Sequence, residues 1–361
     1  MNTILHTILL LFAMFASPLV ASANDWMARL SDDTRVCRVS IPGTHDAATG
    51  EGFIPEDTLL GNRIAITQEL PLTKQWQAGI RAFDLRPDVR TDSLGKQSLH
   101  VYHGEFATRA SFAYVLQLLR DSLRAHPTEF AVIIMRHESS PNRQSLRWGD
   151  MMDYALALNR DILVDFRPDI TVGQMRGRVL LLSRDEYGTM PRGGYLSGWR
   201  HDADVDFTRP ATIRGNYSEG RLVLQDFYDM SGEDGMPTKL GAIERLQRLV
   251  TNREVLGADA NTWFVNHTSG YLLTTNNYGP EPVSTSEGYR ANAAETNRWL
   301  VNLIESRESR VRHHLSKIGS GRPHRVSTGI VMMDFGGCDN SGTYNVYGKR
   351  LVDTIINSNF Q

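Results

Sequence analysis

Residues 36–48 read VCRVSIPGTHDAA, and this stretch sets the expected fold. It begins with a short apolar run that is typical of a buried strand. The run ends in Pro42-Gly43-Thr44, and two ionisable residues, His45 and Asp46, follow directly. Barrels of parallel strands place their active sites at the carboxyl ends of the strands. The stretch therefore predicts both a barrel strand and a catalytic residue pair.

The same pattern recurs along the chain. A second strand-like segment ends in Phe83-Asp84-Leu85-Arg86, and a third ends in His103-Gly104. Several of the later segments are near-continuous apolar runs, which indicate strands covered on both faces. The predicted strands are 36–42, 80–85, 99–103, 130–136, 178–183, 222–228, 263–267 and 328–335.

Helical patterns separate most of these strands. In residues 111–124 the apolar side chains recur at helical spacing, and residues 239–252, 289–315 and 347–357 also predict helices. The link 86–98 contains Pro87 and Gly95 and is predicted to be a loop. Eight strands with crossover helices indicate a single-domain α/β protein, a distorted (β/α)8 TIM barrel with an incomplete set of helices.

Composition narrows the class of protein. The 361 residues are 41% hydrophobic, which is enough for one large core, and no repeat of fixed period is present. The formal net charge of −2 gives no basic stripe for nucleic acid, so no nucleic-acid partner is expected. It also gives little long-range attraction to an anionic membrane.

The N-terminal segment predicts export. Residues 4–20 are almost all apolar, and Ala21-Ser22-Ala23 offers a small-residue cleavage site, as in a secretory signal peptide over residues 1–23. Its first residues lack Lys and Arg, so a membrane anchor is the alternative, although the run is short for a span. The mature chain 24–361 is then secreted or periplasmic.

An exported chain invites a disulfide between its two cysteines, Cys37 and Cys338. Cys37 lies at the start of the first predicted strand, and Cys338 lies just past the end of the last. Parallel strands would hold the two sulfurs about 20 Å or more apart. We therefore expect two free thiols.

Alternation along a strand indicates which side chains share the barrel mouth. Asp84 and Arg86 are two residues apart, and so are Asp226 and Tyr228. Two histidines can exchange protons near neutral pH, and an arginine can neutralise phosphate oxygens. Taken alone, a strand-end histidine is more often structural, and an Asp-x-Arg pair is equally often a plain ion pair.

A resemblance to a known family favours the catalytic interpretation. Ser40 to Asp46 is similar to the first signature of the bacterial phosphatidylinositol-specific phospholipase C family. The resemblance continues in order through blocks at 67–69, 78–86, 103–104, 179–184, 191–195, 225–228 and 330–335. It spans nearly the whole mature chain. The first block is specific, and the later ones carry weight through their order.

The resemblance implies a role for each matching residue. His45 would be the general base on the inositol 2-hydroxyl, oriented by Asp334. His103 would be the general acid on the diacylglycerol oxygen, assisted by Asp46. The phosphate would be bound by Arg86, with Asp84 beside it. The inositol ring would be held by residues that match the family's head-group positions: Arg136, Arg184, Asp226 and Tyr228. Diacylglycerol and inositol 1,2-cyclic phosphate would be the products, and slow hydrolysis of the cycle would follow.

Arg86 also implies turnover without a metal or other cofactor. Calcium-using relatives place carboxylates around the phosphate and lack an arginine there, and a guanidinium repels a divalent cation. Arg136 departs from the family, which commonly has a lysine at that position, and the two side chains are not equivalent. The range of inositol head groups, including glycosylated anchors, is therefore left open.

Other residues receive a structural or peripheral interpretation. We expect Glu138 to form an ion pair at the barrel mouth and His137 to be structural. Asn266 begins a formal glycosylation motif. The segment 61–66, with Ile64 and Ile66, and the apolar residues 271–273 are candidates for contact with the membrane surface; packing under the rim is the alternative.

Two rival functions remain at this stage. A metal-dependent glycerophosphodiester phosphodiesterase could use a similar barrel, but its His-Arg-Gly start and Glu-x-Asp pair are absent. A non-catalytic inositol-lipid-binding protein could keep the scaffold and lose the reaction. For the preferred function, the expected partner is a phospholipid at a membrane surface, phosphatidylinositol or a glycosylated anchor, and the expected state is a monomer.

Overall fold

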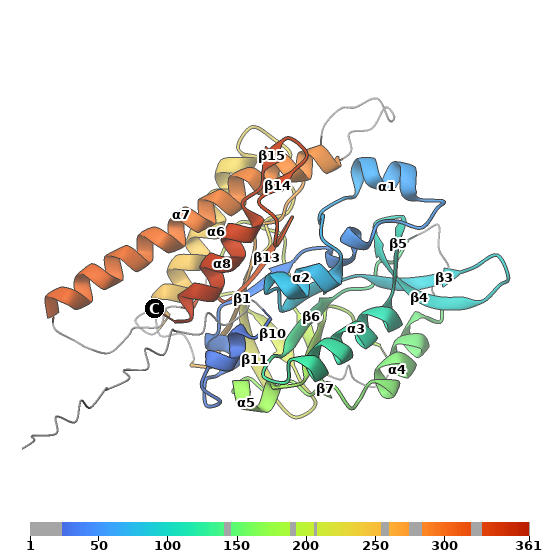
Figure 1. The fold of residues 1–361 in the computed structure, drawn as a ribbon, viewed down its shortest axis with the longest axis horizontal. Coiled ribbons are helices and arrows are strands. Elements are labelled where there is room, and N and C mark those ends of the chain that lie inside the picture. Colours follow the sequence, from blue (N-terminus) through green and yellow to red (C-terminus); the bar gives the residue numbers. More distant parts are fainter. Residues whose placement is uncertain are drawn as a thin grey trace, which may run out of the picture.

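The computed structural model describes residues 24–140, 146–187, 193–205, 208–253, 260–273, 284–318 and 327–360. Their centre is a closed sheet with the strand order β6-β2-β1-β13-β12-β11-β10-β9-β8, in which β8 pairs again with β6 (Figure 1). The strands are β1 Ile41–Thr44, β2 Ala82–Leu85, β6 Ala131–Met135, β8 Val179–Ser183, β9 Gly194–Ser197, β10 Ala211–Arg214, β11 Glu219–Gln225, β12 Trp263–His267 and β13 Ile330–Met333.

The barrel is mainly parallel, as predicted. Neighbours from β8 round through β1 to β11 run in the same direction, and β10 alone runs against both of its neighbours. The short strand β7, Leu163–Val164, pairs with the start of β8. An antiparallel link such as β10–β11 needs only a tight turn, here residues 215–218, so no crossover helix is required there. The distorted barrel is confirmed.

Two predicted strands are wrong in detail. Residues 36–38 form a short 3-10 helix, and the first strand begins only at Ile41. Residues 99–103 belong to β4, Gln97–His103, which lies outside the barrel in a three-stranded antiparallel sheet with β3, Pro87–Thr91, and β5, Phe106–Ser111.

A turn in the link 86–98 explains this difference. The Asp92 carboxylate accepts hydrogen bonds from the amides of Leu94 and Lys96, and Gly95 adopts a φ of 77°. This turn reverses the chain at once, so the predicted loop is largely strand β3, paired with β4. The predicted gap in the helices is also misplaced, because α3 lies between β5 and β6 on the way from β2 to β6.

Helices cover the barrel on two flanks (Figure 1). On one side α6, α7 and α8 lie next to one another, and α3 and α4 lie on the other side. The predicted helix over 111–124 is confirmed, since Ser111 caps α3 by accepting from the Tyr114 amide. The helices are α1 Thr58–Ile64, α2 Leu72–Ala78, α3 Phe112–Ala125, α4 Trp148–Leu158, α5 Val172–Met175, α6 Gly235–Thr251, α7 Ser286–Ile318 and α8 Gly348–Ser358.

A buried ion pair ties the N-terminal segment to the barrel. The Arg81 Nε lies 2.9 Å from Glu129 Oε2, and both side chains are fully buried. The other carboxylate oxygen accepts from the amide of Met27, and the guanidinium lies over the Trp76 ring. A charged pair at this depth is stable only while both partners are present.

The predicted free thiols are confirmed, since Cys37 and Cys338 form no disulfide. The predicted signal peptide, residues 1–23, lies outside the described residues. Within the described part of the chain, none of the helices combines the length and the apolar character that crossing a membrane requires.

Candidate active site

The first catalytic candidates are brought together by the register of two parallel strands. Thr44 at the end of β1 pairs with Met333 at the end of β13, so the next residues, His45 and Asp334, lie side by side. Their side chains are buried, and His45 Nδ1 lies 2.8 Å from Asp334 Oδ1. The Gln68 amide fixes both turns, because its Nε2 donates to the carbonyl oxygens of His45 and Met333.

Arg86 occupies the centre of the site. Its Nη2 lies 2.8 Å from His45 Nε2 and 3.3 Å from Asp84 Oδ2, and its Nε lies 3.0 Å from Asp46 Oδ1. Asp46 adopts a left-handed backbone conformation with a φ of 43°, one that aspartate tolerates better than most residues. The Asp46 amide donates to the Asp84 carboxylate, which connects the end of β1 to the end of β2.

His103 reaches the same site from the antiparallel sheet. Its Nε2 lies 3.4 Å from Asp46 Oδ2, while Nδ1 donates to the carbonyl oxygen of Ala65, 2.8 Å away. The same oxygen, Asp46 Oδ2, also lies 3.1 Å from His45 Nε2. One carboxylate therefore lies between two imidazoles whose ring centres are 6.4 Å apart.

These contacts assign the protons of the first imidazole. A guanidinium can only donate hydrogen bonds, so His45 Nε2 accepts from Arg86 and its Nδ1 carries the proton that faces Asp334. Burial and the neighbouring Arg86 charge place the pKa of His45 well below its ordinary value. The His45 imidazole is therefore neutral at neutral pH, with a free electron pair at Nε2 once Arg86 turns to a ligand.

Burial also shifts the carboxylates. It raises the pKa of Asp46 to about 6, although Arg86 and His103 oppose the shift. Burial and the negative charge of Asp46 raise the pKa of Asp334 well above its ordinary value. Burial alone would lower the pKa of Arg86, but Asp46, Asp84 and Glu138 raise it well above its ordinary value. The guanidinium therefore stays charged.

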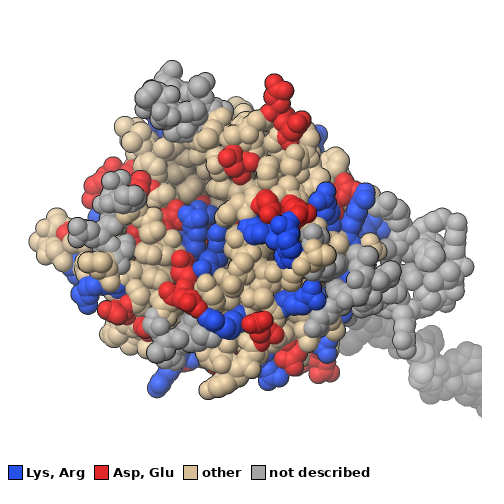
Figure 2. Space-filling view, turned by 180° about the vertical axis from the view of Figure 1, so that it is seen from behind, with Lys and Arg blue, Asp and Glu red and all other residues tan. Residues whose placement is uncertain are grey.

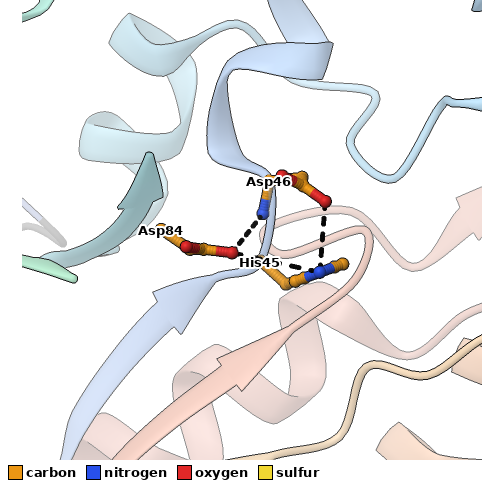
Figure 3. Close-up of side chains that lie close together, drawn as sticks. All are labelled: His45, Asp46 and Asp84. Atoms are coloured by element: carbon orange, nitrogen blue, oxygen red, sulfur yellow. Dashed lines mark hydrogen bonds and ion pairs between the residues drawn. The ribbon is translucent and has the colours of Figure 1, made fainter. Parts of the chain in front are cut away.

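One group of side chains could be considered for a metal ion. His45, Asp46 and Asp84 each offer a ligand atom within 4.8 Å of the others (Figure 3). The Arg86 guanidinium contacts all three of these residues and carries a positive charge at the same point. A divalent ion would have to displace this buried cation, so the donor set does not fit a metal while Arg86 holds its position.

A second group of predicted residues lines the neighbouring strand ends. Asp226 follows β11 and accepts from Trp199 Nε1 at 2.8 Å, and its Oδ2 lies 3.0 Å from His201 Nδ1. The Tyr228 ring lies 5.3 Å from the His45 ring, at a tilt. Arg184 lies over the Trp199 ring. Asp226, Tyr228 and Arg184 therefore form one wall next to His45.

Arg136 is held by a carboxylate next to Arg86. Its guanidinium is bound by Glu138, at 2.9 Å from Nη2, and Glu138 lies 3.9 Å from Arg86. The predicted ion pair of Glu138 is thereby confirmed, and Glu138 links the Arg136 guanidinium to that of Arg86. On the face drawn in Figure 2, groups of Lys and Arg near the middle lie close to groups of Asp and Glu.

Sequence reasoning missed three aromatic residues of this site. His201 and Trp199 lie in the segment after β9, a strand that was not predicted. His267 ends β12 and is buried, with Nδ1 3.8 Å from Asp226 Oδ1. The signal for His267 was present, since it ends a predicted strand as His103 does. The formal glycosylation motif at Asn266 is inaccessible, because that side chain is fully buried.

Two peripheral predictions can also be assessed. His137 is structural, as expected: it stacks on Trp148 at 4.2 Å and its Nε2 lies 2.9 Å from Asp88 Oδ1. The predicted rim helix is α1, in which Ile64 is half-buried, whereas Leu59 is 69% exposed and Leu60 47%.

Comparison with known proteins gives sequence and structural relatives. No protein-family model matches the chain. The 1-phosphatidylinositol phosphodiesterase of Listeria monocytogenes is 31% identical over 174 residues, covering 45% of this chain and 50% of that protein, so the match spans half of this relative. The Staphylococcus aureus protein of the same name is 23% identical over 223 residues, covering 59% of this chain and 68% of the relative.

Solved structures extend the likeness to almost the whole chain. A phosphatidylinositol-specific phospholipase C structure from S. aureus superposes with a TM-score of 0.68 at 19% identity, covering 94% of this chain and 98% of the other. The L. monocytogenes enzyme gives a TM-score of 0.61 at 23% identity, covering 94% and 100%. The chain is thus a distant homologue of the bacterial phosphatidylinositol-specific phospholipases C, similar to them in sequence over about half of its length and in fold over almost all of it.

Proposed function

We propose that the chain is a phosphodiesterase that cleaves phosphatidylinositol to diacylglycerol and inositol 1,2-cyclic phosphate without a metal ion. The observation that carries this proposal is the placement of Asp46 between two imidazoles, His45 and His103, with Arg86 in contact with both His45 and Asp46. Proton acceptor, phosphate ligand and proton donor are then in one buried site.

The reaction follows from this order of groups. His45 Nε2 takes the proton of the inositol 2-hydroxyl, and the oxygen attacks phosphorus. The bond to the glycerol oxygen breaks, and His103 Nε2 supplies a proton to that leaving oxygen. Arg86 neutralises the charge that grows on the phosphate oxygens. Inositol 1,2-cyclic phosphate is then hydrolysed slowly by the same residues, with water as the nucleophile.

The two carboxylates next to the imidazoles have different roles. Asp334 accepts from His45 Nδ1, which fixes the tautomer and stabilises the imidazolium that forms. Asp46 contacts His103 Nε2 and holds that ring toward the leaving oxygen. Asp84 holds Arg86 in position.

The inositol ring is assigned to the adjoining wall. Asp226 accepts hydrogen bonds from ring hydroxyls, Tyr228 stacks on the ring, and Arg184 donates hydrogen bonds to ring oxygens. Arg136 contributes at the rim, where Glu138 holds it. The metal-dependent rival loses support because Arg86 occupies the only group of potential ligands found among the described residues.

We further propose that residues 1–23 direct export, that the chain from residue 24 is one catalytic barrel, and that it acts as a monomer at membrane surfaces. The exposed Leu59 and Leu60 on α1 and the partly exposed Leu272 and Leu273 could contact lipid. One solved structure of the S. aureus relative concerns the modulation of its membrane binding.

A lipid panel tests the substrate class. Vesicles containing phosphatidylinositol, phosphatidylcholine or phosphatidylserine are incubated with the protein, and diacylglycerol is measured. We expect diacylglycerol from phosphatidylinositol alone, and a loss of several orders of magnitude in His45→Ala and His103→Ala. Binding of phosphatidylinositol with no diacylglycerol would instead support the non-catalytic rival.

A further inference from the structure

A third imidazole, His267, lies in the site beside the two proposed catalytic ones. It ends β12, which pairs with β11 on one side and β13 on the other. His267 is therefore held between the strands that deliver Asp226 and Asp334. Its side chain is only 4% exposed.

The contacts of this ring leave one nitrogen unused. Nδ1 lies 3.1 Å from Ser269 Oγ and 3.8 Å from Asp226 Oδ1. The ring packs edge to face against His45, at 6.1 Å, and against Trp199, at 5.7 Å. Among the described residues, neither Nε2 of His267 nor Oδ1 of Asp226 has a hydrogen-bond partner.

These two unpaired acceptor atoms indicate the kind of ligand that would hydrogen-bond to them. Leaving a buried polar atom without a partner costs free energy, which a bound hydroxyl can recover. Burial lowers the pKa of His267 to about 4, so the ring is neutral and can accept one hydroxyl and donate at its other nitrogen. A neutral acceptor next to a carboxylate fits neighbouring hydroxyls of a polyol ring better than it fits an anion.

We propose that His267 binds the inositol hydroxyl next to the attacking one and so determines specificity for the ring. This inference rests on the proposed function. His45 takes the proton of the 2-hydroxyl, and carbon 1 carries the phosphate, so the hydroxyl nearest to His267 is the one on carbon 3. Because Nε2 is buried, a neighbouring side chain must move to admit this hydroxyl.

A substrate-by-variant cycle tests the assignment. The wild type and His267→Phe are assayed on phosphatidylinositol and on its 3-deoxy analogue. We expect His267→Phe to lower kcat/KM on phosphatidylinositol by about 10- to 100-fold and to have little effect on the analogue. His267→Gln, which keeps a hydrogen-bonding group, should recover part of the loss. His100→Phe, a half-buried histidine of β4, is the control and should treat both substrates alike.

Each result decides the matter. Equal losses of His267→Phe on both substrates, or no loss, would overturn the assignment. If His267→Phe does not fold, the wild type alone can still overturn the assignment. Equal wild-type rates on phosphatidylinositol and its 3-deoxy analogue would show that no side chain binds the 3-hydroxyl. A wild type that cleaves neither substrate would refute the proposed function itself, which is a distinguishable outcome.

Discussion

Removing the charge of Asp334 while keeping its shape is the sharpest test of the proposed base. Burial raises the pKa of Asp334 while His45 is neutral, but once His45 is protonated its charge favours the ionised carboxylate. In Asp334→Asn the amide can still lie 2.8 Å from His45 Nδ1, but it cannot stabilise the imidazolium as a carboxylate does. Two unit charges about 4 Å apart interact by about 4 kcal/mol at an effective dielectric constant of 20. That corresponds to about a 10³-fold loss in kcat, since about 1.4 kcal/mol is tenfold in rate.

The assay is initial-rate cleavage of phosphatidylinositol in detergent micelles, with kcat and KM measured separately. The loss should fall in kcat, because Asp334 lies behind His45 and does not contact the substrate in the proposed mechanism. Asp353→Asn on α8, a half-exposed carboxylate paired with Lys349, is the matched control and should leave kcat unchanged. A folded Asp334→Asn protein within about threefold of the wild type would refute the reasoning, because that difference is under 1 kcal/mol.

Three further outcomes are expected. Arg86→Lys keeps the charge but loses the fork that reaches Asp46, Asp84 and His45 together, so kcat should fall about 10²- to 10³-fold; a change confined to KM would contradict this. Burial raises the pKa of Asp46 to about 6, so the protonated carboxyl stabilises the fold at low pH, and this stabilisation is lost as pH rises through 6. Because Asn cannot ionise, the Tm of Asp46→Asn relative to that of the wild type should be higher at pH 8 than at pH 4. An unchanged difference in Tm across this range would be inconsistent with it. Glu129→Gln removes the carboxylate that pairs with the buried Arg81 and should cost about 3–5 kcal/mol in urea denaturation, and a loss under about 1 kcal/mol would show that the pair is dispensable.

The barrel could be predicted because its buried strands carry a strong signal. Residues 131–135 and 179–183 are apolar runs buried on both faces, and only a sheet covered by helices accommodates them. The strands β9 and β10 gave no such signal, because they are short and their side chains alternate between buried and exposed. The antiparallel sheet was mistaken for a barrel strand and a loop because the Asp92 turn, which reverses the chain, was not recognised.

The site was predicted where it depends on strand ends alone. His45 and Asp334 follow paired strands, so their contact is a consequence of register. His103 was placed at the mouth on a wrong premise, since its strand is outside the barrel; the bulge between His100 and Tyr102 and the bond to Ala65 bring it in. Trp199 and His201 could not be placed, because they depend on the path of an irregular segment between β9 and β10.

Phosphorus NMR of the reaction products, recorded with chelator and again with added calcium, tests the central claim most directly. If two imidazoles and a guanidinium suffice, the signal of a five-membered cyclic phosphate should appear first and at the same initial rate in both samples. A slower conversion to inositol 1-phosphate should follow. Inositol 1-phosphate formed with no cyclic precursor, or turnover that stops in chelator and returns with calcium, would contradict the account.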